Sequence, residues 1–388
     1  TKGEECAFVR DLIQTQGIEV ITLDVGVLNP PKTEATISRE EVFQAAGTSL
    51  TTLRQQADRG KAIEAASKGA TKVAQRLHEE GRVDGIISLG GSAGTTIGTA
   101  AMRALPFGVP KVMVSTLASG QVRPYVGIRD VCMMHSVVDI SGLNRISRTV
   151  LSNAAHALVG MVKSEHSQSE NDKPIIAATM FGVTTPCVEH ARSLLENDYE
   201  VLVFHATGTG GMTMESFILD GLISGVMDIT TTELADELVG GVLSAGRDRL
   251  TAAAMRKIPQ VISLGALDMV NFGPRDTVPE KFSDRRFYQH NENVTLMRTT
   301  PDECDELGKE IAHKASASQG PTAIVMPLRG VSAIDIEGGP FWWPEADQAL
   351  FQSIRNWLSP SVKLVELDLH INDPELASQA TEILKAIS

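Results

Sequence analysis

Short apolar runs alternate along the chain with longer stretches in which apolar residues recur at helical spacing. This order predicts strands and helices that alternate, which is typical of parallel sheets covered on both faces. The predicted strands are residues 18–23, 83–89, 111–115, 131–137, 175–180, 201–204, 225–229, 260–264, 294–297, 322–327 and 362–369. The predicted helices include residues 6–16, 39–46, 50–80, 93–104, 148–163, 186–196, 212–219, 345–358 and 374–387, with two more beginning near residues 233 and 301. The stretch 50–80 is predicted to be mostly helical, with a break at Arg59-Gly60-Lys61 as the alternative.

Two segments stand outside this alternation. Residues 164–173, SEHSQSENDK, are polar and have no apolar period, which is typical of a linker. Because 388 residues are also too many for one ordinary core, we expect two Rossmann-like, doubly wound α/β domains with mainly parallel sheets, residues 1–165 and 174–388. Residues 265–286 contain two prolines and little periodicity, so they are predicted to form a long, functional loop.

Composition excludes several classes of partner. A net charge of −13 argues against nucleic acid, and no apolar run reaches the roughly 20 residues of a membrane span. The four cysteines are scattered without a C-x-x-C pair, so we expect a cytoplasmic protein without structural zinc. No signal peptide opens the sequence, and its loop-like start at Thr1 leads us to expect that a segment is missing upstream.

The most pointed pattern is residues 201–217, VLVFHATGTGGMTMESF. An apolar strand, a glycine-rich turn and a helix direct backbone N–H groups and a helix N-terminus at one spot, which suits a phosphate or a carboxylate. The alternative is an ordinary tight turn between strand and helix. The sequence matches neither G-x-x-x-x-G-K-[ST] nor G-x-G-x-x-G, so the turn does not tell which of the two anions binds. The predicted ligand contacts of this second glycine turn are Thr207, Gly208, Thr209, Gly210 and Gly211.

A first glycine turn of similar design follows the strand at residues 83–89. For this turn the alternative, a purely structural role of the glycines, is stronger. Gly94 and Gly98 can simply let a helix pack closely on the sheet. We therefore expect Gly94→Ala to act mainly on folding and Gly210→Ala to act mainly on ligand affinity. The predicted ligand contacts of the first glycine turn are Gly90, Gly91, Ser92, Gly94 and Thr95.

Polar residues at other strand ends extend the predicted site, since ligands of doubly wound sheets lie beyond the carboxyl ends of the strands. Asp228 follows an apolar run and can hold Mg²⁺ on a nucleotide, or it can simply end its strand. His205 is a candidate acid or base, with a buried, hydrogen-bonded histidine as the alternative. Further candidate phosphate donors are Thr184, Thr185, Thr230 and Thr231.

Long segments of the sequence resemble a known family. They are LGGSAGTTIGT, VVDISGLNRISR, FGVTTPCVEHAR, HATGTGGMTMES, DITTTELADELVGGVLSAG, GALDMVNFGPRDTVPE, NVTLMRTTP, PLRGVSAID and HINDP. They look like a bacterial and plant family that includes the N-terminal domain of the tomato tobamovirus-resistance protein, often labelled "ATP-binding domain-containing". The resemblance covers essentially the whole chain and implies two Rossmann-like domains, ATP binding and homodimers.

The same resemblance has implications for the N-terminus of this chain and describes a role for the plant relative. Family members open with a strand that runs into G-T-x-D-T-K-G-x-E, of which this sequence retains only residues 1–5, TKGEE. The resemblance therefore implies a truncated first strand and the loss of a nucleotide-facing Asp. In the plant relative, the implied role is to bind and inhibit a viral replication protein.

Two functions follow as hypotheses. The first is a protein that binds ATP, with Mg²⁺, or another phosphorylated small molecule in a cleft between its domains. Its chemistry would be phosphoryl transfer or ATP-assisted activation of a small acid. The second is a non-catalytic, nucleotide-responsive regulatory protein that acts through protein–protein contacts. Whether the protein is an enzyme stays open, and small-residue helices at 93–104 and 152–160 favour a homodimer.

Overall fold

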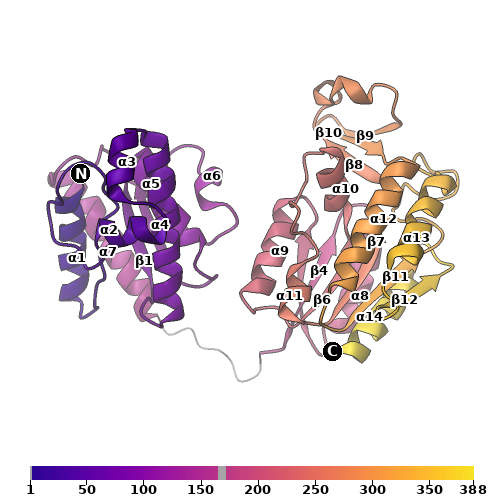
Figure 1. Cartoon of the computed structure of the whole chain (residues 1–388). Coiled ribbons are helices and arrows are strands. Elements are labelled where there is room, and N and C mark those ends of the chain that lie inside the picture. The colour runs from indigo at the N-terminus through magenta and orange to yellow at the C-terminus, as the bar shows by residue number, and fades with distance from the viewer. Residues whose placement is uncertain (1, 165–171) are drawn as a thin grey trace. The chain divides into compact units, whose positions relative to one another are not determined.

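The computed structural model describes residues 2–164 and 172–388, and it divides the chain into two compact units, residues 1–168 and 169–388 (Figure 1). Each unit is an α/β structure built on a parallel sheet, so the predicted Rossmann-like fold class is confirmed. The predicted linker, residues 164–173, lies mostly outside the described residues. No described helix has the length and apolar character needed to cross a membrane.

Unit 1 is organised around a three-stranded parallel sheet in the order β1-β2-β3. The central strand β2 is buried at every residue, and the three strands end together because Ser115 pairs with both Gly90 and His135. Helices α1 and α7 pack in one apolar cluster with the sheet, and α4 and α5 pack in another. The elements are α1 (Gly3–Thr15), α2 (Arg39–Ala45), α3 (Leu50–Gln56), α4 (Arg59–Glu79), β1 (Ile86–Gly90), α5 (Ser92–Arg103), β2 (Lys111–Ser115), α6 (Arg123–Val126), β3 (Cys132–His135) and α7 (Arg145–Lys163).

One prediction in unit 1 is wrong, and a second is made more exact by the structure. Residues 18–23 form no strand, because the only pairing among the described residues there is a single bridge between Leu23 and Ile37. Their apolar side chains still pack on the core, which explains the strand-like pattern without a strand partner. The stretch predicted to be mostly helical, residues 50–80 with a break near 59–61 as the alternative, is two helices that separate just before that position, since Ala57 takes a left-handed φ of 49° and Asp58 caps α4.

Unit 2 contains a six-stranded parallel sheet in the order β12-β11-β7-β6-β4-β5. Helices α8 and α14 cover one face, while α9 to α13 cover the other. The elements of this layer are β4 (Ile175–Met180), α8 (Thr185–Leu195), β5 (Glu200–His205), α9 (Thr209–Leu219), β6 (Gly225–Thr230), α10 (Thr232–Val239), α11 (Ala252–Arg256), β7 (Gln260–Gly265), α12 (Pro301–Ser316), β11 (Thr322–Pro327), α13 (Pro344–Trp357), β12 (Lys363–Leu367) and α14 (Pro374–Ile387).

The prediction of one long loop over residues 265–286 is also wrong. This segment contributes β8 (Met269–Phe272) to a small antiparallel sheet. This sheet has the order β8-β10-β9, with β9 at Phe287–Asn291 and β10 at Val294–Arg298. Figure 1 shows it in orange beyond one end of the parallel sheet. The short run of β8 is interrupted by Asn271, whose buried amide donates to Asp236, so the sequence lacks a clear strand period. Two single 3₁₀ turns, Arg275–Thr277 and Glu280–Phe282, complete the segment.

Candidate functional site

The first glycine turn connects β1 to α5 and leaves a helix N-terminus open. The N-cap residue Gly91 has no side chain, and the first internal backbone bond of the helix is from the N–H of Thr95 to the carbonyl of Gly91, at 2.8 Å. Within the described chain, the N–H groups of Ser92, Ala93 and Gly94 meet no hydrogen-bond acceptor. Because helix α5 spans twelve residues, its dipole adds positive potential at these donors.

The open terminus is held against the sheet by internal contacts. The hydroxyl of Thr95 donates to the carbonyl of Gly91 at 2.8 Å and lies 2.6 Å from the hydroxyl of Ser115. Thr95 is fully buried, so it positions the turn and is not presented to a ligand. A Cβ on Gly90 would lie 2.8 Å from the Cα of Gly94, which explains why a glycine occupies this close approach.

The same edge of unit 1 carries a strained residue. Val137 follows β3 and has a φ of 65°, although it is a β-branched residue that rarely adopts the left-handed region. Its side chain is 65% exposed, so apolar burial does not account for this conformation. The hydroxyl of its neighbour Ser136 donates to the carbonyl of Val138 at 2.7 Å and tightens the turn. Strain of this kind is frequent beside ligand sites.

The second glycine turn connects β5 to α9, and its N–H groups are already bonded. The carboxylate of Glu233, from α10, accepts hydrogen bonds from the N–H of Gly208 at 2.7 Å and of Gly211 at 3.0 Å. Glu233 is fully buried. The place that the sequence assigns to an anionic ligand is therefore filled by one of the protein's own carboxylates.

A buried arginine holds that carboxylate in place. Arg249 donates from Nε to Glu233 at 2.7 Å and from both terminal nitrogens to Asp228, at 2.5 and 2.6 Å. Its guanidinium also lies 3.3 Å from Glu215, which accepts the N–H of Leu250 at 2.6 Å. Burial alone lowers the pKa of Arg249, but these carboxylates outweigh it and raise that pKa well above its ordinary value. Burial raises the pKa of Glu233, and Arg249 and the glycine N–H groups oppose that rise.

The structure places the predicted metal ligand inside this network. Besides Arg249, the carboxylate of Asp228 accepts the hydroxyl of Thr179 at 2.7 Å, and Asp228 is only 1% exposed. Thr230 and Thr231 are fully buried, and their hydroxyls donate to the carbonyls of Thr179 and Ser263. These groups tie neighbouring strands together and are not presented to a ligand. Among the described residues, no three His, Cys, Asp or Glu side chains are arranged to hold a metal ion.

The predicted glycine contacts in the second turn have a packing role. A Cβ on Gly210 would lie 1.7 Å from the carbonyl oxygen of His205, and one on Gly211 would lie 2.1 Å from Glu233. Gly208 has a φ of 80° and approaches the carbonyl of Ser244 in the same way. The helix therefore begins so close to the strand and to Glu233 that only glycine fits.

The remaining predicted residues lie at the start of α8 and beside the second turn. Thr184 is fully buried, and its hydroxyl lies 2.7 Å from that of Thr230. The hydroxyl of Thr185 donates to the carbonyl of Phe181 at 3.2 Å. Thr207 donates to the carbonyl of His205 at 3.3 Å, while Thr209 and His205 are exposed. The ligand and catalytic roles of these residues stay predictions.

Sequence reasoning missed Arg249, the residue that organises unit 2. It lies in SAGRDRL between α10 and α11, where no motif distinguishes it from the neighbouring, exposed Arg247. Complete burial of one arginine among Glu215, Asp228 and Glu233 arises only when distant segments meet. The sequence contains one indication of this network, which is Glu233. It is a carboxylate in the first turn of α10, directly after Thr230, Thr231 and Thr232.

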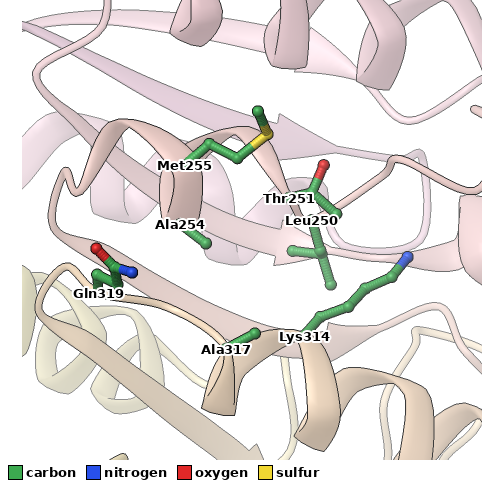
Figure 2. A pocket seen from close by; sticks show the side chains of 7 residues that line it. All are labelled: Leu250, Thr251, Ala254, Met255, Lys314, Ala317 and Gln319. Atoms are coloured by element: carbon green, nitrogen blue, oxygen red, sulfur yellow. The ribbon is translucent and has the colours of Figure 1, made fainter.

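The described chain also contains a cavity of about 300 Å³ between α11 and α12, shown in Figure 2. At its rim, Lys314 donates to the carbonyl of Arg249 at 2.7 Å and pairs with Glu310, so its charge is already satisfied. The cavity belongs to neither glycine turn. It is lined by Leu250, Thr251, Ala254, Met255, Lys314, Ala317 and Gln319.

Fold and turns together define the class of protein, which is a Rossmann-like α/β protein of two units with one open and one internally filled glycine turn. The chain belongs to the uncharacterised protein family UPF0261: residues 1–167 match its N-terminal domain and residues 173–388 match its C-terminal domain. The resemblance inferred from the sequence motifs is thus confirmed.

Its relatives come from bacteria and from tomato. A UPF0261 protein of Clostridium tetani is 53% identical over 379 residues, which cover 97% of this chain and 94% of that protein. A UPF0261 protein of Rhizobium meliloti is 47% identical and covers all of this chain and 97% of its own length. The tomato ToMV resistance protein Tm-1 is 44% identical over 339 residues, which cover 85% of this chain but only 45% of the tomato protein.

Proposed function

We propose that unit 1 binds ATP or another phosphorylated small molecule, with a phosphate group at the N-terminus of α5. The observation that carries this proposal is the set of three backbone donors, at Ser92, Ala93 and Gly94, that meet no acceptor among the described residues. Such donors at the positive end of a helix dipole form a common phosphate site in α/β proteins.

The second glycine turn supports the proposal by internal analogy. There, the same sequence of strand, glycines and helix binds an anion, the carboxylate of Glu233, through two backbone N–H groups. The first turn has the same construction and no internal carboxylate among the described residues. An anionic group from a ligand is the natural counterpart of that difference. Mg²⁺ would arrive with the nucleotide and keep phosphate oxygens and water as most of its ligands.

Binding is common to both hypotheses about the reaction. An enzyme of phosphoryl transfer or ATP-assisted activation would release ADP or inorganic phosphate, whereas a regulatory protein would bind without turnover. The names of the tomato relatives, a ToMV resistance protein and its susceptible counterpart, describe a response to a virus and name no reaction, which favours the second candidate. Assay of ADP release with Mg²⁺-ATP separates the two.

The binding test uses a matched pair of substitutions at Ala93, a half-buried residue in the first turn of α5. Ala93→Glu adds a carboxylate in the first turn of α5, as Glu233 supplies one to the second turn, while Ala93→Gln has the same size without the charge. We expect calorimetry to show that Ala93→Glu weakens ATP binding by at least about tenfold, equivalent to about 1.4 kcal/mol, and that Ala93→Gln stays close to the parent. Helix stability should not fall, because a carboxylate favours this end of the dipole.

Two results would contradict the proposal. One is an absence of binding of ATP, ADP or inorganic phosphate to the parent protein at millimolar concentration. The other is Ala93→Glu protein that binds ATP as tightly as the parent does.

We also propose a cytoplasmic homodimer. All four cysteines are free, which fits a reducing compartment. Small residues of α5 serve internal packing, since a Cβ on Gly98 would lie 2.3 Å from the hydroxyl oxygen of Ser88, so they do not by themselves supply a dimer face. Light scattering that gives the mass of one chain, 41.6 kDa, would count against the dimer.

A further inference from the structure

A second buried arginine lies in unit 2, away from the Arg249 network. Arg298 ends β10, and three carboxyl groups from separate segments surround it: Asp268 after β7, Asp335 in the loop of residues 330–343, and Asp347 in α13. We refer to these four residues as the Arg298 cluster. Arg298, Asp268 and Asp335 are at most 1% exposed, and Asp347 is 7% exposed.

The arginine binds the loop and the helix directly. Its Nε donates to the carbonyl of Phe341 at 2.7 Å, and one terminal nitrogen donates to Asp347 at 2.5 Å. The same nitrogen lies 3.7 Å from the carboxylate of Asp335. The other terminal nitrogen donates to the hydroxyl of Thr299 at 2.8 Å. The cluster thus connects β10 to the middle and the C-terminal end of the 330–343 loop and to α13.

Its hydrogen bonds leave two acceptors without donors. One oxygen of Asp268 accepts the hydroxyl of Ser332 at 2.8 Å, and one oxygen of Asp335 accepts the N–H of Val331 at 2.9 Å. The second oxygen of each carboxyl group, Oδ1, is buried and has no hydrogen-bond partner within the described residues. A buried, ionised carboxylate without donors is costly, whereas the protonated carboxyl group is neutral and costs less to bury.

Other titratable groups lie beside the cluster. The ring of His370 has Nε2 2.9 Å from the carbonyl of Ser332 and accepts the N–H of Asn372 at Nδ1. Burial raises the pKa of the Cys304 thiol to about 11, so it stays protonated. Arg285 donates to the backbone carbonyl of Arg298, but Glu303 neutralises it at 2.6 Å.

The three carboxyl groups of the cluster all lie near the single guanidinium of Arg298. Burial, reinforced by the nearby charge of Asp335, raises the pKa of Asp268 to about 8 and that of Asp347 to about 7. Burial also raises the pKa of Asp335. In the unfolded chain these groups have pKa values of about 3.9.

We propose that the Arg298 cluster is a proton-dependent latch, which holds the 330–343 loop closed while it retains protons and releases it when the carboxyl groups ionise. The loop lies at the carboxyl ends of the parallel strands, since the N–H of Ala266 after β7 bonds to Val331 and the N–H of Ala333 bonds to Val183 after β4. Ligands of such sheets bind at this edge, so the latch would control access to it.

The direction of the pH effect follows from the raised pKa values. A carboxyl group with a raised folded pKa favours the folded state when protonated, so its contribution is complete below about pH 4. That contribution falls as pH rises and is lost above about pH 8, where Asp268 ionises in the folded state. Loosening of the loop is therefore expected between pH 6 and pH 9.

The test is hydrogen–deuterium exchange of the whole protein at pH 6, 7, 8 and 9, corrected for intrinsic rates. We expect the opening equilibrium of residues 330–347 to increase at least tenfold across this range. Asp268→Asn should flatten the dependence, because asparagine keeps an acceptor for Ser332 and cannot ionise. Asp347→Asn is the second variant, should the first fail to fold.

The matched control is Asp368→Asn. Asp368 is an exposed carboxylate, 2.7 Å from Arg329, whose hydrogen bond lowers the pKa of Asp368. This variant should keep the pH dependence of the parent. The proposal is overturned if exchange of residues 330–347 in the parent is unchanged from pH 6 to pH 9. It is equally overturned if the folded asparagine variants of Asp268 or Asp347 retain the full dependence.

Discussion

The two glycine turns of this protein have nearly the same local construction and opposite states. In unit 1, the N-terminus of α5 has three backbone donors that meet no acceptor within the described residues. In unit 2, the N-terminus of α9 is filled by Glu233, which Arg249 fixes from the opposite side. A strand–glycine–helix pattern thus predicts where an anion binds, but not whether the ligand or the protein supplies that anion.

The glycines of the two turns also differ in how closely other atoms approach them. In the second turn they are required by close contacts with backbone or with Glu233. In the first turn, Gly90 also makes a close approach, 2.8 Å from the Cα of Gly94, but a Cβ on Gly91 at the helix start would meet only the hydroxyl oxygen of Thr116, at 3.6 Å. A crowded turn leaves no room for a ligand, whereas an open one does.

The largest expected effect belongs to Gly210→Ala. A Cβ at 1.7 Å from the carbonyl oxygen of His205 forces helix and strand apart, so we expect a loss of about 4 kcal/mol or more in the free energy of unfolding. Urea denaturation measures it. Gly182→Ala is the control, since no atom lies within 4 Å of its Cβ. A Gly210→Ala protein as stable as this control would show that the turn is not crowded.

Next comes Glu233→Gln, which removes the internal anion. Arg249 loses one charged partner in a fully buried site, and the expected destabilisation is about 3 kcal/mol. Glu189→Gln breaks only an exposed pair with Arg192 and should cost less than about 1 kcal/mol. Equal melting temperatures for the two variants would contradict the role of Glu233 as a structural anion.

Asp228→Asn should have an effect of similar size, because asparagine keeps only one of the two acceptors that Asp228 offers to Arg249. We expect about 3 kcal/mol of destabilisation and the same ATP affinity as the parent, with or without Mg²⁺. Unfolding curves and calorimetry measure the two quantities. A loss of ATP affinity seen only with Mg²⁺ would restore Asp228 to the metal role that its sequence position indicates.

The smallest effect is expected for Gly94→Ala. Its Cβ would lie 3.1 Å from the carbonyl oxygen of Leu89, with φ outside the left-handed region, so the cost should stay below about 1 kcal/mol. This reverses the order that the sequence predicts for Gly94 and Gly210. The added methyl group points at the strand, so ATP affinity should remain within about threefold of the parent by calorimetry. A severe folding defect would mean that the first turn is as crowded as the second.

Several features of this protein follow from local sequence. The strands at 111–115, 175–180 and 322–327 and the helix at 374–387 have the predicted bounds, because an uninterrupted apolar run or a clear helical period is a local property. The start of a helix can also be predicted from local sequence. The reciprocal capping bonds of Thr300 and Glu303 at the start of α12 are an example. The family resemblance also rests on linear motifs alone.

Tertiary structure decided the rest. Residues 18–23 have the pattern of a strand, but a ladder needs a neighbouring backbone at the right distance, and only Ile37 provides one. Asp228 is an attractive metal ligand in a linear sequence and a buried partner of Arg249 in the fold. Whether a charge faces a ligand or another side chain depends on which distant segments are brought together, and the low dielectric of the interior makes that pairing decisive.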